Sequence, residues 1–213
     1  MEVTIKDIRE KKPCTDSWVV LLKSLKAKDD KKADATKVDL KHILDTLGVV
    51  DAIWALRCVK DMDKEIRLFA CECAESVLPI YEERFPSNKI PRKAIEASRG
   101  YAEGELKLFH LKQAKDSIFE ASNTSATDVT SLISKLNKKQ FNEACRDNAV
   151  HRAANAAEKT TYPEAYLAAW AASSAARAAV GYEGQMKGSK TTKQKRIEEE
   201  MDKQSQLFVK YFG

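Results

Sequence analysis

The sequence contains few glycines and prolines and has no long apolar run. It has seven glycines and five prolines in 213 residues, and it is rich in alanine, leucine, lysine and glutamate. That composition is typical of helical proteins. Alternating runs of β-branched residues bounded by turn residues are missing, so we expect no sheet. No apolar stretch approaches the roughly 18 residues of a membrane span, so we expect none. The sequence therefore predicts an all-α protein.

The cysteines and histidines do not form the patterns of a disulfide framework or a metal site. Met1 is followed by a charged segment and not by a signal peptide, so we expect a reduced, cytoplasmic protein. Cys71 and Cys73 are too close for a zinc site, and no second pair follows. We therefore predict no metal. The residues in question are Cys14, Cys58, Cys71, Cys73, Cys145, His42, His110 and His151.

Motifs for catalysis are also missing. The chain has no nucleophile motif and no glycine-rich phosphate loop, and its few glycines leave little room for such a loop. We therefore expect no cofactor and no catalytic residues, which argues against an enzyme.

The excess positive charge is local. The chain has a net charge of +5, and residues 187–196 (KGSKTTKQKR) hold five basic residues and no acidic one. The rest of the chain is neutral. Clustered bases can bind phosphate, but no aromatic residues are interleaved for base stacking. We therefore interpret this segment as a solvated linker and regard nucleic-acid binding as the lesser alternative.

Apolar residues with a period of 3.6 predict about ten helices. We expect them to be antiparallel, with stacking in short pairs as one possible arrangement. Two alanine-rich helices between 141 and 180 should pack closely, and Gly181 should end the second. Phe109 is expected on the inner face of its helix. The predicted division is a helical domain over 1–184, a basic linker over 185–196, and an amphipathic helix over 197–213 that packs on the domain. The predicted helices cover about 3–11, 16–25, 38–47, 50–60, 63–77, 91–104, 106–121, 129–136, 141–158, 163–180 and 197–212.

Arginine and glutamate are more frequent between 48 and 104 than a plain helical core requires. Glu96 lies one turn from both Arg92 and Arg99, at spacings that allow ion pairs on one helix. One hypothesis is that such pairs fix the helix register, and the other is that they form a recognition surface. The candidate binding residues are Trp54, Arg57, Arg67, Arg92, Glu96 and Arg99.

The block from Cys14 to Gly104 resembles an all-α "putative immunity protein" family, which is found beside bacterial polymorphic toxins and in phage genomes. The resemblance lies in Asp51–Arg57, Ile66–Ala70, Cys73–Glu75, Val77–Pro79 and Pro91–Arg92, and then in Ala94–Glu96, Arg99 and Tyr101–Gly104. The alanine-rich second half is also similar to that family, although relatives often repeat the Ala–Trp step that occurs in this half only at Ala169–Trp170.

The resemblance implies a small helical protein that binds another protein and has no catalytic residues. The partner would be a toxin or, for a phage protein, a host defence factor that it inhibits. An alternative is a helical ligand-binding or enzymatic domain, in which the Arg/Glu cluster lines a pocket for an anionic small molecule such as a nucleotide signal. The sequence does not distinguish oligomeric states.

Overall fold

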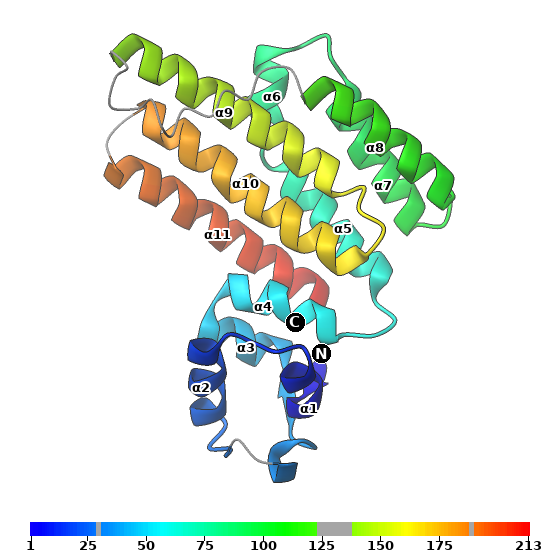
Figure 1. Cartoon of the computed structure of the whole chain (residues 1–213), viewed down its shortest axis with the longest axis vertical. Coiled ribbons are helices and arrows are strands. Elements are labelled where there is room, and N and C mark those ends of the chain that lie inside the picture. Colours follow the sequence, from blue (N-terminus) through cyan, green and yellow to red (C-terminus); the bar gives the residue numbers. More distant parts are fainter. Residues whose placement is uncertain (29–30, 123–137, 188–189) are drawn as a thin grey trace.

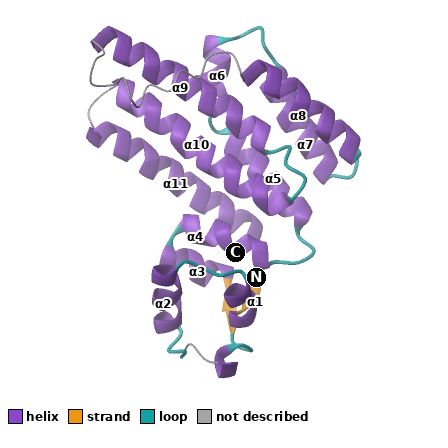
Figure 2. Cartoon of the chain, viewed as in Figure 1, coloured by secondary structure: helices purple, strands orange, loops and turns teal. Residues whose placement is uncertain are grey.

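The computed structural model describes residues 1–28, 31–122, 138–187 and 190–213 (Figures 1 and 2). These residues form eleven α-helices, two short 3-10 helices and one small antiparallel sheet. The all-α prediction is therefore confirmed. The predicted helix over 129–136 lies outside the described residues.

An N-terminal unit contains the sheet and the first four helices. Its elements are β1 (Glu2–Thr4), α1 (Ile5–Glu10), α2 (Thr15–Ser24), η1 (Lys31–Ala33), β2 (Lys37–Asp39), α3 (Leu40–Leu47), α4 (Val49–Ala55) and η2 (Leu56–Cys58).

The two strands correct the expectation of no sheet. Val3 pairs with Val38, and both side chains are buried. Residues that we assigned to helix starts are therefore extended, and the side chains of Thr4 and Asp39 cap the helices that follow. Three-residue strands are too short to show an alternating pattern, so they could not be predicted from the residue pattern.

The remaining helices form the body of the molecule. They are α5 (Asp63–Glu75), α6 (Leu78–Arg84), α7 (Ile90–Ala102), α8 (Leu108–Ser122), α9 (Lys138–Lys159), α10 (Ala165–Lys187) and α11 (Lys190–Phe212). Helices α9, α10 and α11 lie side by side in one layer, and α5 and α7 lie behind it (Figure 1). Helices α9 and α10 pack against each other, as expected of the alanine-rich segment, and buried alanines of both helices share one core; they include Ala153, Ala157, Ala176 and Ala179.

Helix α10 does not end at Gly181 but continues to Lys187. A Cβ atom at Gly181 would lie 3.1 Å from Ile197, and one at Gly184 would lie 3.0 Å from the backbone of Lys193. The glycines therefore allow α11 to approach, and they do not stop the helix. Because α11 begins at Lys190, the described part of the predicted linker over 185–196 is helical. The domain boundary at 184 stays a prediction.

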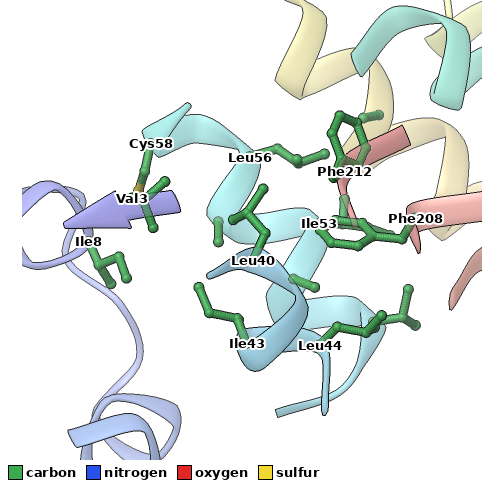
Figure 3. Close-up of a cluster of buried hydrophobic side chains, with 14 of the residues drawn as sticks. Val3, Ile8, Leu40, Ile43, Leu44, Ile53, Leu56, Cys58, Phe208 and Phe212 are labelled. Carbon is green, nitrogen blue, oxygen red and sulfur yellow. The ribbon is translucent and has the colours of Figure 1, made fainter. Parts of the chain in front are cut away.

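Two hydrophobic cores hold these elements together. The first fills the N-terminal unit and includes Phe69 of α5 with Phe208 and Phe212 of α11 (Figure 3). The second lies between α5, α6, α7, α9 and α10. One expected core residue is wrong: Phe109 is 69% exposed, whereas Leu111 of the same helix is fully buried.

Candidate protein-binding surface

Arg67 is a buried structural residue. It lies on α5 and is only 2% exposed. Its side chain stacks on Tyr101, with the guanidinium carbon 5.1 Å from the ring centre. Its Nη1 donates to the carbonyls of Thr160 at 2.9 Å and Tyr162 at 2.7 Å, and its Nη2 donates to that of Pro163 at 2.6 Å. These carbonyls belong to the loop between α9 and α10. We call this arrangement the Arg67 clamp.

Burial lowers the pKa of Arg67, but nearby groups of negative potential oppose the shift. The three carbonyls replace the water that the guanidinium loses, and a buried cation is tolerated only with such partners. For this residue the structure supports the register hypothesis, and the side chain is inaccessible to a ligand.

Arg92 joins α7 to α6. Its Nε and Nη2 donate to the two carboxylate oxygens of Glu82 at 2.8 and 2.6 Å, which is a bidentate ion pair. Lys89 adds a longer contact to the same carboxylate at 3.4 Å. The hydrogen bonds from Arg92 lower the pKa of Glu82 to about 2. Helices α6 and α7 are therefore fixed across the turn that joins them.

Arg99 joins α7 to α5, and Glu96 takes no part in either pair. Arg99 donates to Glu75 at 2.7 Å. Glu96 is exposed and makes no ion pair with any described residue. The predicted pairs Arg92–Glu96 and Glu96–Arg99 are therefore wrong, because both arginines pair with acids on neighbouring helices instead.

Trp54 and Arg57 are two half-buried members of the predicted set that stack on each other. The guanidinium of Arg57 lies 4.5 Å from the centre of the Trp54 ring and 5.4 Å from that of Tyr166 on α10. Its Nε donates to the Trp54 carbonyl at 3.1 Å. All three residues are half-buried. We call these three residues the Arg–aromatic surface; Tyr166 was missed because it is distant in sequence.

Trp54 also borders a small apolar hollow enclosed by α1–α4. Its cavity volume is about 20 Å³, room for about one water molecule. The carboxylate-bearing residue Asp51 is on its rim. The lining residues are Ile8, Pro13, Ser17, Trp18, Leu21, Ile43, Leu47, Asp51, Trp54 and Ala55. Such a hollow is too small for a nucleotide and fits only the tip of a side chain.

The predicted Arg/Glu-lined pocket does not form. Arg67 is bound by the carbonyls of a packed loop, and Arg92 is paired with Glu82 of α6. Arg99 lines a groove between α5 and α11, where Glu72 and Glu75 are paired with Lys210 and Arg99. A groove of such mixed and mutually paired charge does not favour a multiply charged anion.

Sequence reasoning missed a buried polar cluster between α5, α10 and α11. Glu200 is 1% exposed and accepts hydrogen bonds from Ser76 and Gln204, each at 3.0 Å. Gln204 in turn accepts from Arg177 and donates to the Ser173 carbonyl. Burial raises the pKa of Glu200. The only advance signal was a run of three glutamates, 198–200, on an amphipathic helix.

The described residues also bear on metal binding and membrane insertion. Within the ranges described, no three His, Cys, Asp or Glu side chains gather as a metal ion would require. None of the described helices has the length and apolar character of a bilayer span.

The fold and the surface together define an all-α protein in which most of the unusual charges hold helices together, while one Trp–Arg–Tyr group stays accessible. The family model described as Imm-5 like putative immunity protein matches residues 56–162, from η2 to the loop held by the Arg67 clamp, and the chain belongs to that family. Comparison of the chain with the curated proteins and with the solved structures found no match.

Proposed function

We propose that the protein binds another protein and neutralises it stoichiometrically, without catalysis. The partner is a toxin or, if the protein is encoded by a phage, a host defence factor. Membership of an immunity protein family supports a protein partner. The observation that carries the proposal is the Arg–aromatic surface, since Trp, Tyr and Arg are the residues that dominate protein interfaces.

A cytoplasmic setting is part of the same proposal. All five cysteines are free thiols, although several are buried within helical contacts. Free thiols are common in reducing compartments. A toxin or a defence factor would be met there before it reaches its own target.

The test is purification of the tagged full chain from its native host, with mass spectrometry of retained proteins and small molecules. We expect one protein at equimolar ratio, which forms the same complex when both are purified separately. Co-expression should then relieve the growth defect or the defence activity that the partner causes. A retained nucleotide without a stoichiometric protein would contradict the proposal, and so would a complex that leaves the partner fully active.

A further inference from the structure

Arg57 differs from the other predicted arginines in what its side chain contacts. Arg67 donates hydrogen bonds to backbone carbonyls, and Arg92 and Arg99 form ion pairs with carboxylates. Arg57 uses only its Nε, and among the described residues no acceptor pairs with its two terminal nitrogens. A guanidinium with both terminal nitrogens unpaired can donate two hydrogen bonds to one carboxylate.

The two rings hold this guanidinium in place. Trp54 contacts it at 4.5 Å and Tyr166 at 5.4 Å, and the Nε hydrogen bond fixes its orientation. A side chain that is already ordered loses less entropy when a ligand binds. The flanking rings also exclude water from one side of the new ion pair, which strengthens it. Arg57 is therefore prepared to bind an acid.

Trp54 places this arginine next to the apolar hollow. The same residue stacks with Arg57 and lines the hollow together with Trp18. Asp51, one turn before Trp54, also lines the hollow and makes no ion pair with a described residue. A second acid would thus be favoured at Arg57 and repelled near Asp51.

We propose that the Arg–aromatic surface and the hollow bind a segment of the partner protein in which an acidic residue lies beside a large apolar one. This inference rests on the proposed function. The carboxylate pairs with the terminal nitrogens of Arg57, and the apolar side chain lies on Trp54 with its tip in the hollow. Single-stranded nucleic acid, which also uses aromatic residues and arginine, is disfavoured because Asp51 would repel its phosphates.

The experiment is selection of phage-displayed 12-residue random peptides on the immobilised full chain, with a parallel selection on Arg57→Gln. We expect the wild type to enrich peptides with an acid next to a large apolar residue, and the variant not to. The best peptide, made synthetically, is then measured by fluorescence anisotropy. Arg57→Gln should weaken binding on the order of tenfold or more. Arg57→Lys should weaken it less, because lysine keeps the charge but lacks the fork.

Matched controls separate binding from folding. Arg84, an exposed arginine at the end of α6, makes no ion pair with a described residue, so Arg84→Gln removes the same charge elsewhere. It should leave the peptide affinity unchanged, whereas Asp51→Asn removes a repelling carboxylate beside the hollow and should tighten the binding. Circular dichroism and the melting temperature of every variant are recorded, and Arg57→Lys carries the comparison if Arg57→Gln unfolds.

Several outcomes would overturn the inference. They are enrichment without acids, no enrichment at all, equal binding by Arg57→Gln, or tighter binding of a labelled oligo(dT) strand than of any peptide. Failure here is distinct from failure of the proposed function. A native partner that binds wild type and Arg57→Gln equally would refute the surface and leave the function standing. Successful peptide selection without any native protein partner would support the surface and refute the proposed function.

Discussion

Arg67 shows how a single charged residue of α5 can fix a loop that lies far from it in the chain. Its three hydrogen bonds go to the loop that turns α9 into α10, and Ser98 of α7 donates to the Thr160 carbonyl as well, at 2.6 Å. These loop carbonyls have no partners within their own helices. The clamp thus provides hydrogen-bond donors for carbonyls that the close α9–α10 turn would otherwise leave buried and unpaired.

Replacing Arg67 by methionine should destabilise the protein strongly. The change keeps the side-chain length but leaves buried carbonyls unpaired, which costs about 3 kcal/mol or more in the free energy of unfolding. Arg67→Lys should also destabilise, since one ammonium cannot reach all three carbonyls in the same geometry. Urea unfolding followed by circular dichroism measures both. A loss below about 1 kcal/mol for Arg67→Met would show that the clamp is dispensable.

The Arg92–Glu82 pair should make stability depend on acid pH. The folded-state pKa of Glu82 is lowered from its ordinary value of 4.5 to about 2. The pair therefore stabilises the fold above about pH 4.5, and that contribution disappears as the pH falls through about 2. Arg92→Gln should be less stable near neutral pH and should converge with wild type near pH 2.

The size of this effect is limited by solvent. The Arg92 side chain is 44% exposed, so we expect a difference below about 1 kcal/mol near neutral pH. Urea unfolding at about pH 7, 4.5 and 3 measures it, with Arg84→Gln as the control that removes an unpaired arginine. A constant gap between Arg92→Gln and wild type across these pH values would contradict the assignment.

The candidate site was predictable only in part, for reasons visible in single residues. Trp54 and Arg57 were suggested by their residue types, because Trp and Arg are the commonest anchors of protein interfaces. Arg92 and Arg99 instead pair with Glu82 and Glu75, which are ten and twenty-four positions away. Spacing along one helix does not predict contacts between helices, so the long-range pairs and Tyr166 required the structure.

At the scale of elements, α11 is attached to the body through polar as well as apolar contacts. Glu200 faces Cys73 and Ser76 of α5, Arg177 of α10 and Lys203 of its own helix. One of its carboxylate oxygens, Oε2, is buried without a hydrogen-bond partner in the described structure. A buried carboxylate with an unpaired oxygen weakens the contact of this helix when it is ionised.

Glu200→Gln should therefore stabilise the protein near neutral pH. Because the pKa of Glu200 is raised in the fold, its favourable contribution is full below its unfolded value of 4.5. That contribution is lost as the pH rises through the folded value. Glutamine keeps the Oε1 acceptor and carries no charge, so the variant should gain on the order of 1 kcal/mol near pH 7 and depend less on pH. Melting temperatures between about pH 4 and 8 measure this, and a lower melting temperature at pH 7 would show that Arg177 outweighs the burial.

Element boundaries show what the hydrophobic pattern can and cannot predict. The period of 3.6 places Ile66, Phe69, Cys73 and Val77 on one side, and all four are buried. Gly181 was expected to end a helix, but whether a glycine ends a helix or admits a neighbouring one depends on what packs against it. Phe109 was assigned to the core by its period, although Leu108, Phe109 and His110 at the start of α8 are all exposed.

For the whole molecule, two aromatic residues of α11 join the N-terminal unit to the body. Phe208 and Phe212 lie 6.2 and 5.9 Å from Phe69 of α5 between ring centres, and both belong to the core of α1–α4. Figure 3 shows them beside Leu56 and Ile53. The two parts of the molecule therefore share one core and should unfold together.

Phe208→Ala should test that coupling. Phe208 is fully buried, and its truncation should cost about 3–5 kcal/mol. Trp18 and Trp54 lie in the N-terminal unit and Trp170 lies on α10, so tryptophan fluorescence in a Trp170→Phe background reports on the N-terminal unit, whereas circular dichroism reports on all helices. The two unfolding curves should coincide for wild type and separate for Phe208→Ala. Coincident curves for the variant would mean that other contacts join the two parts.

The cysteines have a practical consequence for the binding surface. Cys58, Cys71, Cys73 and Cys145 are buried, and burial raises the pKa of each thiol, whereas Cys14 is exposed. Cys14 lies next to Pro13, and its Sγ contacts the Ser17 hydroxyl at 3.0 Å; both residues line the hollow. A maleimide dye should therefore attach at this one position in the native chain, and its emission would report occupancy of the hollow without any engineered residue.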